Sequence, residues 1–234
     1  IAASVGDVPA GWAGLLTAIA AAGGAPAEWV EAAARLRLPR ELGADACVGA
    51  ATRAGAALAA SGLRLVTVRC RIVHPREFNA LLDAGLNKSD ILSRATLDMA
   101  ASLVHAAAGE SVVWCDRHGG RRRYAPLVSR AFAAPLVQMI SETPERSIYR
   151  LPESRCRIEF SVRGESRLPV ALASMTAKYV RELSMAAFNE WWSGRCAGLQ
   201  PTAGYPVDAV RWRRDAEAAV RDAGLTWDDL WRRA

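Results

Sequence analysis

The sequence predicts an α/β protein in which a mixed sheet is flanked by helices. Short runs of β-branched and aromatic residues, typical of strands, alternate with longer segments whose apolar residues recur at helical spacing. With 234 residues, of which 51% are hydrophobic and 23% charged, the chain can bury a substantial core. Its apolar runs are alanine- and glycine-rich and too short to cross a bilayer, so we expect no membrane span.

The first half of the chain is expected to be largely helical. Prolines at helix starts and a serine at a helix cap indicate the boundaries. The expected elements are helices at 12–21 and 26–36, a strand at 63–73 that is buried on at least one face, a short helix that begins at Pro75, and a longer helix at 90–108 with Ser89 as its N-cap.

The second half carries the rest of the sheet. A strand at 111–115 delivers Asp116 at its carboxyl end, which is where functional groups gather in open α/β sheets. The further expected elements are a helix at 124–132, strands at 136–141, 147–151 and 156–162, one long helix at 169–192, and helices at 208–223 and from 226 onward. We therefore expect a sheet domain over residues 1–168, and a helical portion over residues 169–234 that packs on the same domain.

Charge and cysteine content bear on the partner and the compartment. The net charge of +6 is compatible with binding a polyanion, although only Lys88 and Lys178 among the 30 basic residues are lysines, a bias that codon usage also produces. The five cysteines are odd in number and far apart, which favours reduced thiols over a disulfide framework. We expect a cytoplasmic protein without a membrane partner. The sequence slightly favours a monomer and leaves the oligomeric state open.

Two carboxylates are the strongest candidates for catalysis. Asp116 ends a strand, and Glu165 begins the loop that leads into the long helix. Cleavage of a phosphodiester by divalent metal ions needs acidic oxygens that converge at strand ends and helix starts, because hard cations such as Mg²⁺ take oxygen ligands. Spacing alone favours a simpler interpretation, in which Asp116 caps a turn and Glu165 pairs with Arg163 or Arg167.

Four further side chains are candidates for substrate binding: Ser174, Lys178, Tyr205 and Arg121. Lysine and arginine can contact a phosphate, a tyrosine ring can stack on a sugar or base, and the serine can orient the substrate. Each also has an ordinary structural interpretation. Lys178 can pair with Glu182 one turn later, the serine can serve close packing, the tyrosine can close the core, and the arginine can belong to a solvated loop.

Other chemistries lack their sequence signatures. Cys115 and His118 have the spacing of a zinc-binding pair, but no second close pair of cysteine or histidine accompanies them. The chain contains no Walker phosphate-binding loop, no GxGxxG after a strand and no GxSxG elbow. The usual nucleotide-dependent enzymes and serine hydrolases are therefore excluded.

Several motifs, in the same order along the chain, resemble those of type 2 ribonuclease H, the ribonuclease HII branch of the ribonuclease H-like fold. Residues 164–169 read Gly-Glu-Ser-Arg-Leu-Pro, which resembles that family's Gly-Asp-Ser-Arg-Val-Pro segment. Further similarities join 173–182 to its Ala-Ser-x-x-Ala-Lys-x-x-Arg-Asp helix, 204–206 to its Gly-Tyr-Pro element, and 112–116 to a strand that ends in a metal-binding aspartate. The resemblance covers about residues 63–210.

The resemblance implies a ribonuclease H-like mixed sheet and a metal-dependent endonuclease. Asp116 and Glu165 would hold Mg²⁺ or Mn²⁺, Lys178 would support the site, and Tyr205 would meet the sugar at the cleavage position. The implied substrate is the RNA strand of an RNA–DNA hybrid, recognised through its groove shape and 2′-hydroxyls. Hydrolysis would proceed by attack of an activated water on phosphorus.

Three departures from the family pattern leave other functions open. Glu165 and Glu182 stand where the family has aspartate, and the spacing from Pro169 to Ser174 is one residue shorter than in the bacterial form. The family's opening Asp-Glu-x-Gly-x-Gly strand is absent, and residues 1–4 resemble the strand that follows it, so we expect the missing acids upstream of residue 1 in the full-length protein. The alternatives are a catalytically inactive nucleic-acid-binding relative, and an α/β protein of another role whose acids are structural.

Overall fold

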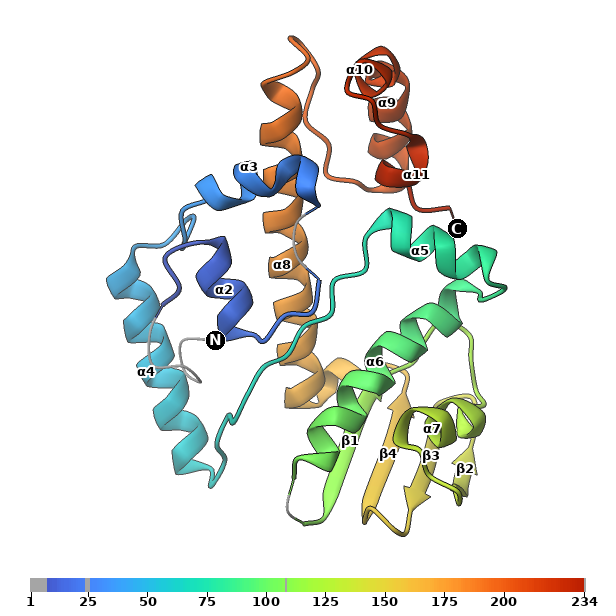
Figure 1. Cartoon of the computed structure of the whole chain (residues 1–234). Coiled ribbons are helices and arrows are strands. Elements are labelled where there is room, and N and C mark those ends of the chain that lie inside the picture. The colour runs from blue at the N-terminus through green and yellow to red at the C-terminus, as the bar shows by residue number, and fades with distance from the viewer. Residues whose placement is uncertain (1–7, 24–25, 108, 234) are drawn as a thin grey trace. The chain divides into compact units, whose positions relative to one another are not determined.

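The computed structural model describes residues 8–23, 26–107 and 109–233. The chain is mixed α/β, with one four-stranded mixed sheet flanked by helices (Figure 1). It divides into two compact units. The sheet unit consists of Pro75–Thr176 together with the residues from Arg232 onward, and the helical unit consists of the residues up to His74 together with Ala177–Trp231. The first part of the chain thus groups with the C-terminal helices, and the division between units falls within the long helix rather than at the expected position between residues 168 and 169.

The sheet contains β1 (Ser111–Asp116), β2 (Gln138–Glu142), β3 (Arg146–Leu151) and β4 (Cys156–Ser161), in the spatial order β1-β4-β3-β2. β1 is parallel to β4, and β3 is antiparallel to both of its neighbours, β4 and β2. These four strands confirm the sequence expectation to within two residues at each end. In the register of the parallel pair, Asp116 lies opposite Ser161, so β1 and β4 finish at the same edge of the sheet.

Two helices cover one face of this sheet, α6 (Lys88–His105) and α7 (Ala125–Phe132) (Figure 1). The core beneath them takes Cys115 from β1 and alternate residues of β3 and β4, as expected for a buried face; its members include Leu97, Ala101, Cys115, Val128, Phe132, Tyr149, Leu151, Cys156, Ile158 and Phe160. The sheet unit also contains α5 (Pro75–Asp83), the 3-10 helix η2 (Gly164–Ser166) and the start of α8 (Leu168–Ser193).

The expected N-cap of α6 was wrong. Asn87 caps this helix, because its side chain accepts the backbone N–H of Asp90 while the Asp90 carboxylate accepts the backbone N–H of Asn87. Ser89 lies inside the first turn, and its hydroxyl donates to the carbonyl oxygen of His118 at 3.0 Å.

The helical unit packs around a cluster of aromatic side chains. It contains α2 (Trp12–Ala18), η1 (Ala27–Trp29), α3 (Val30–Arg35), α4 (Ala44–Ala60), the remainder of α8, α9 (Pro206–Asp215), α10 (Glu217–Asp222) and α11 (Trp227–Leu230). The rings of Trp29 and Phe188 are 5.4 Å apart, and Trp212 lies 4.9 Å from Phe188 and 5.3 Å from Trp192. Aromatic rings of η1, α8 and α9 therefore pack against one another in this unit.

Two further expectations were wrong in detail. Residues 63–73 form no strand; in the described part of the chain their only β pairing is the isolated bridge of Arg71 with Ala22, and Val66 is 69% exposed. The single helix expected at 208–223 is divided at Ala216 into α9 and α10. Among the described residues, no helix combines the length and the apolar character needed to cross a membrane.

Candidate active site

The structure places Asp116 and Glu165 on neighbouring backbone segments at one edge of the sheet unit. Asp116 is the last residue of β1, and the chain leaves the parallel strand β4 at Ser161 to enter η2. The backbone N–H of Gly164 donates to Asp116 Oδ1 at 3.1 Å, and Glu165 is the next residue. Both acidic side chains belong to exposed residues, so the pair faces solvent where a substrate can approach.

Gly164 makes this close approach possible. A Cβ atom at this position would lie 2.9 Å from Asp116 Cα, closer than real Cβ atoms come, and 3.2 Å from the carbonyl oxygen of Cys115, which is a tight contact. The preceding residue, Arg163, adopts the left-handed conformation with φ of 60° and turns the chain back towards β1. The missing side chain at 164 therefore lets the start of η2 lie against the end of β1, one residue before Glu165.

The simpler interpretation, in which Asp116 caps a turn and Glu165 pairs with a nearby arginine, agrees only in part with the structure. Asp116 does accept a hydrogen bond at the start of η2, but this engages Oδ1, and no described residue bonds its second oxygen. Within the described chain, Glu165 forms no ion pair with Arg163 or Arg167, and the Arg167 guanidinium instead lies 5.8 Å from the centre of the Trp114 ring. Carboxylate oxygens of both acids thus remain available.

These oxygens are the type of donor that Mg²⁺ and Mn²⁺ prefer, and Mg²⁺ is commonly held by one or two carboxylates with waters and substrate phosphates. No third histidine, cysteine, aspartate or glutamate joins them into a metal-binding group within the described residues. The donor set therefore fits an ion that is shared with a bound phosphate. It does not form a complete cage of protein ligands.

Cys115 and His118 belong to the core beside this edge. Burial raises the pKa of the Cys115 thiol to about 12, and the neighbouring Asp116 adds to the shift. The His118 ring is occupied as well, because its Nδ1 lies 2.9 Å from the hydroxyl of Ser93. Their C-x-x-H spacing is accounted for by these packing and hydrogen-bonding roles.

The loop that follows β1 is held by buried groups. His118 is 5% exposed, and its backbone N–H donates to the Tyr124 hydroxyl at 3.0 Å. Burial lowers the pKa of His118 to about 4; the nearby Asp116 opposes the shift and Arg121 adds to it. The ring is therefore neutral near pH 7 and serves as a fixed part of the core.

The arginine run in this loop divides into partnered and exposed side chains. The Arg121 guanidinium binds the Asp90 carboxylate, and its Nε donates to Ser89 Oγ at 3.1 Å. Arg122 and Arg123 are exposed. A phosphate contact by Arg121 stays a prediction, and the structure adds that this side chain already neutralises a carboxylate. The long-range pair with Asp90 left no signal in the sequence.

Ser174 lies in the part of α8 that belongs to the sheet unit, where it is half-buried. Lys178 and Tyr205 belong to the helical unit. Lys178 is exposed, and the pair with Glu182 that its spacing suggested is not present, because Glu182 binds Arg181 instead.

Tyr205 presents its ring to solvent. The residue is 61% exposed, and the Arg181 guanidinium lies 4.4 Å from the ring centre, within the range of a cation–π contact. Arg181 also donates to the carbonyl oxygen of Ala203 in the preceding loop. The core-closing interpretation of Tyr205 therefore does not hold, and its ring remains available for stacking.

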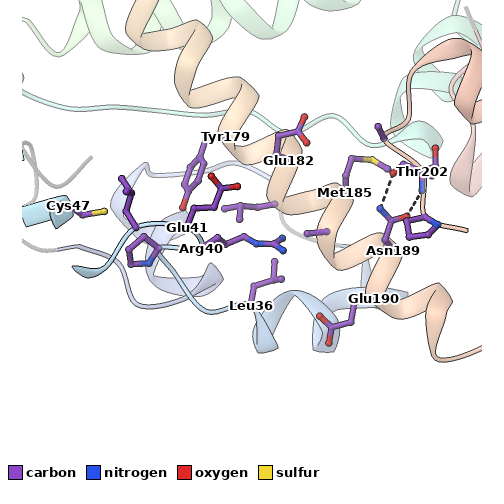
Figure 2. Close-up of a pocket in the computed structure, with 16 residues that line it drawn as sticks. Leu36, Arg40, Glu41, Cys47, Tyr179, Glu182, Met185, Asn189, Glu190 and Thr202 are labelled. Carbon is purple, nitrogen blue, oxygen red and sulfur yellow. Dashed lines mark hydrogen bonds between the residues drawn. The ribbon is translucent and has the colours of Figure 1, made fainter. Parts of the chain in front are cut away.

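A network of side chains fixes the turn before Tyr205. Asn189 of α8 accepts the Thr202 N–H and donates to the Thr202 carbonyl oxygen, each at 2.9 Å, as Figure 2 shows. Asp208 accepts the Thr202 hydroxyl at 2.7 Å and the Ala203 N–H at 2.6 Å. The hydrogen bonds that Asp208 accepts from Arg211, Thr202 and Ala203 lower its pKa to about 2.

The same part of α8 lines a cavity of about 930 Å³ in the helical unit (Figure 2). Tyr179, Glu182, Ala186 and Asn189 line it from α8, and Leu36 lines it from the end of α3. The sequence analysis missed this cavity. The lining residues of α8 recur at helical spacing, so the sequence shows that they share one face of the helix. It does not show whether another segment packs against that face.

The resemblance of residues 1–4 to a family strand lies outside the described residues. Comparison with protein-family models, with curated proteins and with solved structures finds no match to this chain.

Proposed function

We propose that this chain is a ribonuclease H-like endonuclease that hydrolyses the RNA strand of RNA–DNA hybrids with the help of Mg²⁺ or Mn²⁺. The observation that carries the proposal is the hydrogen bond from the Gly164 N–H to Asp116, which holds the backbone next to Glu165 against the end of β1. The ordered motifs that resemble type 2 ribonuclease H add independent support, because they include both acids.

In this proposal, Asp116 and Glu165 hold the metal ions. A divalent ion at such a site supplies Lewis-acid stabilisation of the phosphate and a lowered pKa for bound water. The Gly164 N–H holds Asp116 Oδ1, which orients the carboxylate while its other oxygen has no hydrogen-bond partner among the described residues. Fixing a ligand in advance reduces the reorganisation that binding would otherwise require.

By the resemblance to type 2 ribonuclease H, side chains outside the acid pair would provide the substrate contacts. Tyr205 offers an exposed ring held by Arg181, which suits packing against a sugar, and the exposed Lys178 ammonium suits a phosphate oxygen. Ser174 supplies a hydroxyl for orientation of the substrate. Discrimination of RNA from DNA would rest on the 2′-hydroxyl and the groove shape of the hybrid.

The proposal is tested with the full-length protein and an RNA–DNA hybrid that is labelled on the RNA strand. We expect cleavage in Mg²⁺ or Mn²⁺, none in EDTA, and a loss of at least about 100-fold in Asp116→Asn and Glu165→Gln, because each removes a charged oxygen ligand. Glu153→Gln is the matched control: this exposed carboxylate lies in the β3–β4 turn, at the other end of β4 from Ser161.

The outcomes separate three functions. Metal-dependent cleavage that fails in both acid variants and survives in Glu153→Gln supports the nuclease. Binding of the hybrid without cleavage under any metal would replace it by the inactive nucleic-acid-binding relative. A protein that neither binds nor cleaves would reduce both acids to structural roles.

A further inference from the structure

We propose that the sheet unit binds a backbone phosphate of a polynucleotide in a pocket formed by Arg122, Arg123 and the first residues of α6. The inference rests on the proposed function and adds a substrate contact to the acid pair. The pocket measures about 470 Å³, is open to solvent, and is lined by Asn87, Ser89, Gly120, Arg121, Arg122 and Arg123.

The backbone that carries the two arginines is fixed on both sides. The carbonyl oxygen of Arg122 accepts a hydrogen bond of 2.6 Å from Ser147 Oγ of β3. The N–H of Tyr124 donates to the Tyr149 hydroxyl at 2.9 Å, and the Tyr124 ring stacks on Phe160 with centroids 3.6 Å apart. A binding loop that is already ordered loses less conformational entropy when a ligand arrives.

The charges around the pocket leave Arg122 without an acidic partner among the described residues, and Arg123 with only a long, exposed ion pair. Arg121 neutralises Asp90, the acid nearest the pocket on α6. The Arg123 side chain is 90% exposed, and its Nε stays 3.9 Å from Glu142, at the outer limit of an ion pair. For Arg122, the described part of the chain offers no carboxylate within ion-pair distance. A guanidinium group that is not held by a carboxylate can bind phosphate oxygens through its paired N–H donors.

The floor of the pocket favours a phosphate that is part of a longer chain. Gly120 contributes no side chain, and the position of its absent Cβ has no other atom within 4 Å, so the approach to the arginines is unobstructed. Asn87 and Ser89 add polar side chains beside the arginines. An open site with two cations can accept a phosphodiester whose neighbours extend into solvent, as polynucleotide contacts require.

The test measures hybrid binding separately from cleavage. Fluorescence anisotropy of a labelled RNA–DNA hybrid in EDTA compares the full-length protein with Arg122→Gln/Arg123→Gln. We expect Kd to rise at least about tenfold and the slope of log K against log salt to fall by about 2, because two phosphate contacts are removed. Arg150→Gln/Arg155→Gln removes the same charge from exposed positions of the same unit and should change both quantities far less.

A second arm separates backbone phosphate from free phosphate. Inorganic phosphate is titrated against the hybrid complex, with chloride at equal ionic strength as the reference. We expect the two salts to displace the hybrid equally, because one phosphate cannot replace a polynucleotide that makes several contacts. Displacement by phosphate alone, in the parent protein and not in the arginine variant, would overturn the polynucleotide assignment and show a site for free phosphate.

The results distinguish this inference from the proposed function. If the arginine variant binds the hybrid as tightly and with the same salt slope as the parent while the parent cleaves, the pocket proposal fails and the nuclease stands. If the parent does not cleave but binding weakens in the arginine variant alone, the pocket stands and the nuclease fails. If hybrid binding weakens equally in the Arg150→Gln/Arg155→Gln control, the effect comes from net charge alone, and the pocket proposal also fails.

Discussion

The edge that carries Asp116 and the turn that carries Tyr205 are held by different kinds of contact. Around Asp116 the main chain sets the geometry: the parallel ladder fixes the strand end, and the Gly164 N–H reaches the carboxylate. Around Tyr205 the geometry depends on side chains, since Asn189 and Asp208 hold the residues just before it. The first arrangement should tolerate many side-chain changes except at its glycine, whereas the second should respond to single polar substitutions.

The largest expected difference between the two regions is in their response to acid. The folded pKa of His118 is about 4 against an ordinary value of 6.5, so the unfolded chain takes up this proton first as pH falls. The free energy of unfolding of the sheet unit is therefore independent of this proton above about pH 6.5. Between pH 6.5 and 4 it falls by about 3 kcal/mol, because the unfolded chain binds a proton that the folded chain does not. The turn in the helical unit depends on Asp208, whose pKa of about 2 lies below the ordinary 3.8. The stabilisation by the ionised Asp208 is therefore complete above pH 3.8, and it is lost only as the pH falls through 2.

This difference can be measured by urea unfolding in EDTA between pH 4 and 7, followed by NMR signals of β4 and α9. His118→Asn, which can keep a hydrogen bond to Ser93, should flatten the pH dependence of β4, and His105→Asn, at an exposed position of α6, should not. Equal pH dependence of β4 in the parent and in His118→Asn would show that the burial of this ring does not control the response.

The second prediction disturbs the main-chain arrangement. Gly164→Ala should destabilise the sheet unit by about 1–3 kcal/mol, because the new Cβ meets the backbone of Asp116 and Cys115. Gly120→Ala is the control for stability, since its Cβ would meet no atom within 4 Å. Urea midpoints from β4 signals compare the two variants. An unchanged midpoint in Gly164→Ala would mean that the two backbones can separate freely.

The third prediction, the smallest, disturbs the side-chain arrangement. Asn189→Ala removes two hydrogen bonds of 2.9 Å to Thr202 and should cost about 1 kcal/mol in the helical unit. Chemical shifts of Thr202 and Tyr205 should move with it. Gln200→Ala, at an exposed position of the same loop, is the matched control. If both variants behave alike, the turn owes its shape to its own backbone.

The sequence predicted the parts of the molecule whose information is local. The four strands and α8 were recognisable because each carries its apolar pattern within a few residues, and Asp116 followed as the end of such a strand. Residues 63–73 carry a similar pattern but find no neighbouring strand, apart from the bridge at Arg71, in the described chain. A strand needs a partner, and the pattern cannot supply one.

The parts of the site that escaped prediction depend on contacts between distant residues. Ser89 and Asn87 are both good cap residues, and only the reciprocal bond with Asp90 decides between them. The engagement of Arg121 by Asp90 joins residues 31 apart in the chain. The close approach of Gly164 to Asp116 likewise joins η2 to the end of β1, 48 residues apart in the chain, and leaves no local trace.

The position of β1 in the sheet has a consequence for how the site could be extended. Within the described residues, β1 pairs with β4 on one side only, so the backbone donors and acceptors along its outer side are open to strand addition. A strand that joined there in parallel would finish beside Asp116 and deliver its own last side chains to the same corner. Under the proposed function, such a strand could supply further oxygen ligands without altering any residue already in place.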